Sequence, residues 1–253
     1  MALQALIWDV DGTLVDNEER HRQAFNEAFA AADLAWHWDQ ATYHDLLGVT
    51  GGRERIARYV RAVDPARAAS PDFDAFVRRL HADKTRRFGH LLEAGVTLRP
   101  GVARLFAEAR AAGLALAIAT TTSRINVERL FERTLGRATL DGFRIVASGE
   151  DVTAKKPAPD LYRVALAGLG LAAGACLAIE DTALGLQAAR GAGVPTLITV
   201  SRYSADEEFS GALAVLDSLG EPDRPARALQ GDLHGRTCVD LDLLRCWHSE
   251  NNK

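Results

Sequence analysis

The sequence predicts an α/β fold, a doubly wound parallel sheet with an inserted all-helical domain. A short apolar run at residues 5–8 is followed, from residue 114 onward, by apolar runs that alternate with segments of helical periodicity. This alternation is the pattern of a parallel sheet covered by helices. Between the two regions, residues 15–98 show helical periodicity alone. We therefore expect a core domain formed by residues 1–14 and 99–253, and a helical domain formed by residues 15–98.

The first predicted strand, residues 5–8, leads directly into the stretch Asp9-Val-Asp-Gly-Thr13. A short apolar run that ends at a glycine indicates a buried strand. Because side chains alternate along an extended chain, Asp9 and Asp11 can point into one crevice at the carboxyl end of the strand. Two carboxylates this close repel one another unless a cation lies between them, and Mg2+ suits oxygen ligands. A strand followed by an ordinary Asp-Gly turn would use the same residues.

The inserted domain is predicted to contain helices only. Apolar residues at positions 25, 28 and 29 recur at helical spacing behind a charged first turn, which indicates an amphipathic helix. Gly51 and Gly52 interrupt the chain before the same period resumes, and Pro71 suits the first turn of a long helix. The predicted helices cover residues 17–32, 39–47, 53–60 and about 70–92.

Beyond residue 99 the chain alternates between predicted helices and predicted strands. The helices cover residues 102–113, 126–135, 159–169 and 182–193. The strands cover residues 114–119, 143–147, 175–179 and 196–200. After Ser201 the periodicity weakens. There we expect an edge strand over residues 212–216 and a loop over residues 220–232, because the second stretch is rich in proline, glycine and charge.

Polar residues also follow the next three apolar runs along the chain. Thr120 follows one run, Lys156-Pro157 lies in the loop after the next, and Glu180-Asp181 follows the third. The carboxyl ends of parallel strands meet at one edge of a sheet, so these groups are expected to converge on a phosphate and Mg2+ site. Taken singly, each has an ordinary explanation as a strand-end hydroxyl, a surface charge or a helix cap. Their occurrence together and in this order favours the site.

Composition excludes several classes of function. The chain of 253 residues has 34 acidic against 30 basic residues and a net charge of −4, which argues against binding to nucleic acid or a membrane surface. No apolar run has the length of a membrane span. Cys176, Cys238 and Cys246 form neither a CxxC pair nor an even framework, so we expect incidental thiols. A cytoplasmic monomer is expected.

In the polar residues that follow its four apolar runs, the chain resembles the haloacid dehalogenase superfamily of aspartate-nucleophile phosphohydrolases. The resemblance implies that Asp9 is the nucleophile, which forms an aspartyl phosphate, and that Asp11 is the general acid and base. Elementary chemistry agrees, because a carboxylate attacks phosphorus only when the phosphate charge is neutralised. The matching motifs, in the family's order, are Asp9-x-Asp11-Gly12-Thr13, Thr120, Lys156-Pro157 and Glu180-Asp181.

The same resemblance assigns the remaining core residues. It implies that Thr120, with Thr121 beside it, and Lys156 bind the phosphoryl oxygens. It also implies that the helical domain is a cap that excludes water from the reaction. The implied cofactor is Mg2+, surrounded by Asp9, Asp11 through its backbone carbonyl, Glu180 and Asp181.

Within the family, the cap residues resemble the branch that contains β-phosphoglucomutase, and more closely the CbbY-type sugar bisphosphate phosphatases. This resemblance implies that Glu18 and His21 face the reacting end of the substrate. It implies that Arg53 and Lys84 hold the far phosphate, with Gly51 and Gly52 letting the backbone approach it. The residues that carry it are Glu18-Glu-x-His21-Arg-x-Ala-Phe-Asn26, Trp36-x-Trp38, Thr50-Gly-Gly-Arg-Glu-Arg-Ile56 and Lys84-Thr-x-Arg-Phe88.

Charge in the cap supports an anionic substrate independently. Residues 50–92 contain ten Lys or Arg against five Asp or Glu, although a solvated helical face accounts for most of these charges. We expect a Mg2+-dependent phosphatase for a phosphorylated sugar, with xylulose 1,5-bisphosphate as the expected substrate. A phosphomutase and a phosphatase for another small ester, such as phosphoglycolate, remain alternatives. A phosphoaspartate switch is the weakest alternative, because it has no use for an inserted cap.

Overall fold

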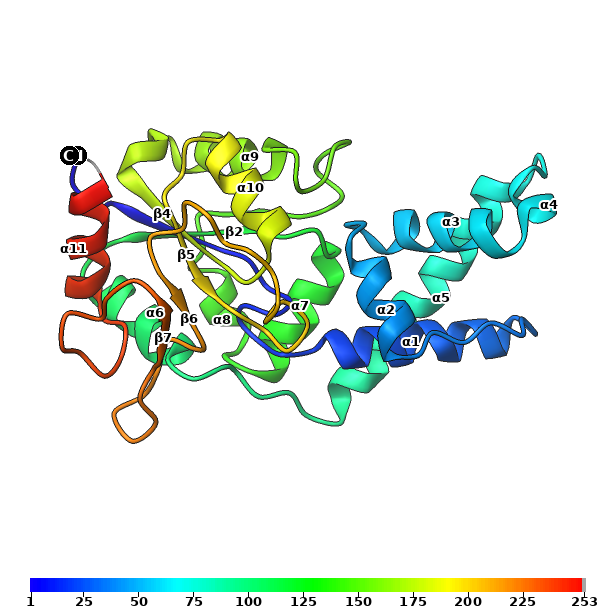
Figure 1. Ribbon diagram of the computed structural model, residues 1–253, viewed down its shortest axis with the longest axis horizontal. Helices are drawn as coiled ribbons and strands as arrows, with labels where there is room; N and C mark the ends of the chain where they lie inside the picture. The colour runs from blue at the N-terminus through cyan, green and yellow to red at the C-terminus, as the bar shows by residue number, and fades with distance from the viewer. Residues whose placement is uncertain (252–253) are drawn as a thin grey trace. The chain divides into compact units, whose positions relative to one another are not determined.

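The computed structural model describes residues 1–251, and the chain divides into two compact units (Figure 1). The core unit combines Met1–Asp16 with the chain from Thr97 onward, and the helical unit spans Asn17–Val96. The chain therefore leaves the core unit once and returns to it once. No helix within residues 1–251 combines the length and the apolar character that crossing a membrane requires.

The centre of the core unit is a seven-stranded sheet. Its strands are β1 (Ala5–Trp8), β2 (Ala115–Ala119), β3 (Ile145–Ala147), β4 (Cys176–Glu180), β5 (Thr196–Thr199), β6 (Val215–Leu216) and β7 (Ala228–Gln230). They follow the order β3-β2-β1-β4-β5-β6-β7, and all pairs are parallel except β6 with β7. The strand order therefore reverses between β1 and β4. At such a switch point, doubly wound sheets bind ligands beyond the carboxyl ends of their strands.

The helices of the core unit are α6 (Val102–Ala111), α7 (Arg124–Arg133), α8 (Arg137–Leu140), α9 (Asp160–Leu169), α10 (Ala183–Gly191) and α11 (Leu241–Asn251). A short 3-10 turn, η1 (Ala173–Ala175), precedes β4. Helix α9 packs on β1, β2 and β3 and buries Leu161, Tyr162 and Ala165 at helical spacing. Alanines dominate the sheet surface beneath α9 and α10, and small side chains let helices approach a sheet closely. This packing places Tyr162 beside the end of β4.

The predicted α/β fold class is confirmed, whereas two predictions for the chain after Ser201 are wrong. Residues 212–216 do not form an edge strand, because β6 pairs with β5 on one side and with β7 on the other. The loop predicted over residues 220–232 contains β7. This strand has only three residues, two of them exposed, so backbone pairing rather than a buried apolar face holds it. Periodicity cannot reveal such a strand.

The helical unit contains α1 (Glu18–Ala31), α2 (Gln40–Leu47), α3 (Gly52–Val63), α4 (Pro65–Ala68) and α5 (Phe73–Glu93). Helices α1 and α5 pack against each other, and aromatic rings fill the centre. The rings of Phe25 and Trp38 lie 4.6 Å apart, and those of Phe29 and Trp38 lie 4.9 Å apart. Asn26 fixes Trp38 by hydrogen bonds in both directions to its backbone, at 2.8 and 2.9 Å. The loop between α1 and α2 is thereby tied to α1.

Candidate active site

Two acidic side chains lie side by side where β1 and β4 end. Trp8 lies opposite Ile179 in the parallel pairing, and the N–H of Asp9 donates to the Ile179 carbonyl at 3.0 Å. This register places Asp9 next to Glu180. Both side chains are buried. A parallel sheet therefore delivers two carboxylates to one edge, as the strand pattern predicts.

Lys156 lies between these two carboxylates. Its Nζ is 2.6 Å from Oδ1 of Asp9 and also hydrogen-bonds Oε1 of Glu180. The Tyr162 hydroxyl donates to the same Glu180 oxygen at 2.8 Å. Lys156 is itself buried, and charge-assisted contacts in a dry site are among the strongest hydrogen bonds. Lys156 and Tyr162 thereby hold both carboxylates in place.

Asp9, Glu180 and Asp181 form a buried cluster whose ligand oxygens lie within 4.8 Å of one another. The backbone is shaped around two of them. A Cβ at Gly12 would lie 2.0 Å from an Asp181 oxygen, and a Cβ at Gly185 would lie 2.1 Å from a Glu180 oxygen. Carboxylates seated against bare glycine, in an all-oxygen donor set with excess negative charge, fit a hard divalent cation.

The charges of the cluster perturb one another. Burial raises the pKa of Asp9 to about 8, against the pull of Lys156 and with the help of Glu180. Burial also raises the pKa of Asp181, and the charges of Asp9 and Glu180 add to the effect. Burial opposes the charge on Lys156, but Asp9 and Glu180 outweigh it and raise the pKa of its ammonium. Three carboxylates thus share one ammonium, and without a further cation the cluster retains a proton at neutral pH.

Hydroxyl groups line the neighbouring strand end. Thr120 directly follows β2 and is buried, and its hydroxyl accepts a hydrogen bond from the Thr122 N–H at 3.2 Å. Thr121 is only half-buried. A Cβ at Gly149 would lie 2.2 Å from the Thr121 carbonyl, so a glycine is required where the loop after β3 meets the end of β2. Both threonines lie at the sheet edge where the sequence predicts phosphate ligands.

A tight loop follows Asp9. Gly12 has a φ of 87°, and its N–H donates to the Val15 carbonyl at 2.8 Å. Asp11, the predicted acid and base, is half-buried in this loop. Arg99 donates to the carbonyl of Gly12 and, at 2.6 Å, to that of Val200. The half-buried Arg99 guanidinium therefore ties the loop that carries Asp11 to the end of β5.

Three residues that shape this site were not predicted: Arg99, Tyr162 and Ser201. Ser201 hydrogen-bonds Asp181 and lowers its pKa, which opposes the effect of burial. In the sequence, Tyr162 occupies an ordinary buried position of a helix, and Arg99 is a polar residue before a proline. Their roles appear only in the folded structure, where segments that are distant in sequence lie close together.

In the helical unit, Glu18 and His21 each have defined partners. The Tyr43 hydroxyl donates to Glu18 at 2.6 Å, and Arg55 donates to the Tyr43 oxygen at 3.1 Å. The His21 ring stacks on Phe88, with centroids 3.8 Å apart. These contacts fix the two side chains that the family resemblance predicts to face the reacting end of the substrate.

Lys84 and Arg53, the predicted phosphate ligands, have different environments. Lys84 is buried, with Nζ 2.5 Å from Nδ1 of His21 and 4.7 Å from the centre of the Phe25 ring. Arg53 is exposed at the start of α3, and no side chain within residues 1–251 pairs with its guanidinium. Gly52, the residue before Arg53, also lies near Phe25, because a Cβ at Gly52 would lie 3.5 Å from the Phe25 ring.

The glycines before Arg53 have specific structural reasons. Gly51 has a φ of 92° at the start of α3, a conformation that other residues rarely adopt. A Cβ at Gly52 would lie 2.5 Å from Nε2 of His81, one turn before Lys84 on α5. His81 was not predicted as a neighbour of Gly52 and Lys84. Its spacing of three residues from Lys84 nevertheless places both side chains on one face of α5.

The sequence model of the family described as haloacid dehalogenase-like hydrolase matches residues 3–193. This range contains every residue of the buried core cluster and most of the chain. The chain belongs to the haloacid dehalogenase-like hydrolase family. The resemblance inferred from the four motifs is thereby confirmed.

Individual members of the haloacid dehalogenase-like family are also similar to the chain. Protein CbbY, plasmid, of Cupriavidus necator is 48% identical over 248 residues, 97% of each chain. Phosphoglycolate phosphatase of Rhodospirillum rubrum is 32% identical and covers 86% of this chain and 90% of its own. The crystal structure of a CbbY variant from Rhodobacter sphaeroides, in complex with xylulose 1,5-bisphosphate, has a TM-score of 0.80 and 45% identity, over 85% of this chain and 94% of that one. The protein is an enzyme, a phosphatase of this family.

Proposed function

We propose that this haloacid dehalogenase-like phosphatase hydrolyses a sugar bisphosphate, xylulose 1,5-bisphosphate, with Mg2+ and through an aspartyl phosphate on Asp9. The observation that carries the proposal is the buried contact between Lys156 and both Asp9 and Glu180, with Asp181 in the same cluster. This arrangement pairs a nucleophile with a cation that can neutralise a phosphoryl group. It also leaves enough carboxylate charge to bind a divalent ion.

Asp9, Glu180 and Asp181, with the Asp11 carbonyl, are the proposed ligands of Mg2+, which when bound supplies positive charge to the phosphoryl oxygens. Lys156 holds Asp9 in a fixed orientation and stabilises the charge that develops on the transferring group. Thr120 and Thr121 offer hydroxyl and backbone donors to the same oxygens. Positioning and charge supply most of the catalysis in phosphoryl transfer.

Asp11 is the proposed acid and base. An Asp9 oxygen forms a bond to phosphorus while the phosphorus bond to the sugar oxygen breaks, and Asp11 gives its proton to that oxygen. Asp11 then takes a proton from the water that attacks the aspartyl phosphate, which restores Asp9 and releases inorganic phosphate. Arg99 supports this role because it anchors the Gly12 carbonyl next to Asp11.

In the helical unit, Arg53 and Lys84 are the proposed ligands of the phosphate that is not transferred. Arg53 supports this proposal because it is exposed and unpaired within the described residues. Lys84 supports it because its buried ammonium lies beside Nδ1 of His21 and 4.7 and 4.9 Å from the centres of the Phe25 and Phe88 rings, and a cation held in such a place can pair with a phosphate. The relative that was crystallised with xylulose 1,5-bisphosphate, at 45% identity, favours that sugar over other esters.

A release assay tests the substrate. We expect inorganic phosphate from xylulose 1,5-bisphosphate at a kcat/KM at least tenfold above those for phosphoglycolate and glucose 1-phosphate, because the second phosphate adds charge-assisted contacts. Faster release from a monophosphate would contradict the bisphosphate substrate. Conversion of glucose 1-phosphate into an isomer without net release would identify a phosphomutase instead.

A trapping experiment tests the mechanism separately. With Asp11→Asn, we expect turnover to fall by roughly 10^2 to 10^4, the usual contribution of general acid-base catalysis. An activated aryl phosphate needs no acid, so its phosphoryl group is expected to accumulate on Asp9, detectable by mass spectrometry of the intact protein. Wild-type turnover in Asp11→Asn would show that another residue supplies the proton.

A further inference from the structure

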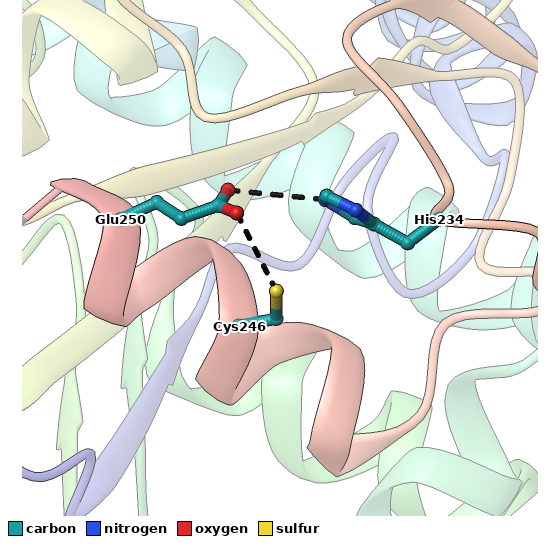
Figure 2. Close-up of side chains that lie close together, drawn as sticks. All are labelled: His234, Cys246 and Glu250. Carbon is teal, nitrogen blue, oxygen red and sulfur yellow. Dashed lines mark hydrogen bonds and ion pairs between the residues drawn. The ribbon is translucent and has the colours of Figure 1, made fainter.

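We propose that His234, Cys246 and Glu250 form a second metal site, which binds a transition-metal cation of the Zn2+ type. The three side chains converge in the C-terminal part of the core unit (Figure 2). Cys246 and Glu250 lie one turn apart on α11, and His234 reaches them from the preceding loop. No catalytic residue belongs to this cluster.

The three ligand atoms lie near the separations that a tetrahedral ion requires. Sγ of Cys246 is 3.6 Å from Oε1 of Glu250, and Nε2 of His234 is 3.8 Å from Oε2. All three ligand atoms lie within 4.8 Å of one another. Zinc bonds of about 2.0 to 2.3 Å at tetrahedral angles place sulfur and oxygen ligands about 3.6 Å apart, and nitrogen and oxygen about 3.4 Å apart. Small side-chain rotations would therefore complete the site.

The loop holds His234 in position before any ion binds. His234 has a φ of 52°, a conformation that non-glycine residues adopt only where the surroundings support it. Its N–H donates to Oδ1 of Asp232 at 2.8 Å, and Nε1 of Trp247 donates to the Asp232 carbonyl at 3.0 Å. Trp247 is a neighbour of Cys246 on α11, so the same helix fixes the loop and supplies two of the three ligands.

The donor atoms select a different metal from the catalytic cluster. Asp9, Glu180 and Asp181 offer oxygen only, which suits Mg2+. A thiolate, an imidazole and a carboxylate suit Zn2+ and Co2+, and a site with three protein ligands leaves a fourth position for water. On binding, the sulfur to hydrogen bond of Cys246 breaks, the proton passes to buffer, and a sulfur to metal bond forms.

The site lies at the opposite end of the sheet from the catalytic carboxylates. His248, next to Trp247 on α11, bonds the Gly174 carbonyl at 2.9 Å, just before β4 begins. Glu180 is the last residue of β4, and a strand of this length spans about 13 Å. A metal here ties the loop around His234 to α11. We therefore expect it to stabilise the C-terminal part of the core unit without entering the phosphatase reaction.

Cobalt titration of the full chain, with Mg2+ in excess and a phosphine reductant present, tests the proposal. Thiolate ligation to Co2+ produces a sulfur-to-metal charge-transfer absorption that the all-oxygen catalytic cluster cannot produce. We expect one such Co2+ per chain, displaced by Zn2+. Cys246→Ser is expected to abolish the absorption, and His234→Gln and Glu250→Gln to weaken Co2+ binding by about tenfold or more.

Matched controls separate the site from ordinary surface groups. Cys238→Ser removes the other partly exposed cysteine. His90→Gln removes a histidine whose Nδ1 lies 3.7 Å from Glu93, a similar pair without sulfur. Both controls are expected to keep the absorption, and Cys246→Ser is expected to keep wild-type phosphatase activity. If Cys246→Ser fails to fold, His234→Gln tests the site with the sulfur intact.

Two results would overturn the proposal. One is the absence of charge-transfer absorption in the wild-type protein at a tenfold molar excess of Co2+. The other is absorption that survives Cys246→Ser or is unchanged in His234→Gln, which would place the bound ion on another cysteine or on sulfur alone. Neither result bears on the phosphatase mechanism, so failure here and failure of the proposed function are distinguishable.

Discussion

The ammonium of Lys156 lies 2.6 Å from Oδ1 of Asp9, and both side chains are buried. Lys156 also bonds Glu180. One cation thus serves two carboxylates, so the cluster keeps a net negative charge inside the protein. Breaking a buried pair by removing one partner is costly, because the remaining charge stays buried and uncompensated.

Lys156→Met is therefore expected to abolish phosphatase activity and to lower the free energy of unfolding of the metal-free protein by about 3 to 5 kcal/mol at neutral pH. Urea denaturation in EDTA measures the loss. Lys155→Met, at the less buried neighbouring position, serves as the control and should leave both properties near wild type. An active Lys156→Met enzyme would contradict the role assigned to the ammonium.

The pKa of Asp9, raised to about 8, predicts how stability depends on pH. Between the usual carboxyl pKa and pH 8 the folded protein retains a proton that the unfolded chain releases, so metal-free stability falls as pH rises. The slope from this group approaches about 1.4 kcal/mol per pH unit. We expect Asp9→Asn to be inactive, because it lacks the nucleophile, and to show a smaller slope.

Denaturation midpoints in EDTA at pH 5.5, 6.5 and 7.5 measure this slope. Saturating Mg2+ should also flatten it in the wild-type protein, because a bound cation favours the charged carboxylates. If the metal-free wild-type protein became more stable over this pH range, the carboxyl group would be ionised throughout, and the proton assigned to the cluster would be absent.

How far the site could be predicted depends on the kind of signal. Asp9, Thr120, Lys156 and Glu180 come directly after apolar runs or in the loops between strands, and a parallel sheet brings such positions to one edge. Their convergence follows from order along the chain. By contrast, Tyr162 reaches Glu180 from the middle of α9, and nothing in its local sequence distinguishes it from a core residue.

The C-terminal part was harder to predict for a related reason. Strand β7 is held by backbone pairing with β6 and carries exposed side chains, so it has no apolar pattern. Helix α11 buries Leu244 and His248 at helical spacing. The sequence therefore carries a helical pattern here, but it extends over a short segment only. The cluster of His234, Cys246 and Glu250 depends on a loop conformation, which spacing along the chain cannot reveal.

Gly185 is expected to control metal affinity through Glu180. Gly185→Ala places a Cβ 2.1 Å from a Glu180 oxygen, so the carboxylate must move. Alanine is a better helix former than glycine by about 1 kcal/mol, so a loss is not explained by helix propensity. We expect the Mg2+ concentration for half-maximal activity to rise by about 10- to 100-fold.

Gly191→Ala on the same helix is the matched control. The atom nearest to its new Cβ is Cβ of Pro159, at 3.4 Å, so this change displaces no carboxylate. Mg2+ titrations of phosphate release compare the two variants. Equal Mg2+ requirements in Gly185→Ala and Gly191→Ala would show that Glu180 does not bind the ion, whatever the effect of either change on stability.

Arg53 offers the sharpest test of the proposed second phosphate site. It is exposed and has no ion-pair partner within residues 1–251, so Arg53→Ala should leave folding unchanged. A charge-assisted contact contributes roughly 1.5 to 3 kcal/mol, about ten- to a hundredfold in kcat/KM. The loss is expected for xylulose 1,5-bisphosphate and not for a pentulose monophosphate.

Arg58→Ala is the control, because it removes another arginine of the same helix. The Arg58 guanidinium lies 3.7 Å from a carboxylate oxygen of Asp45. Equal losses on both substrates would assign Arg53 a general structural role, and no loss on either would return it to the solvated surface.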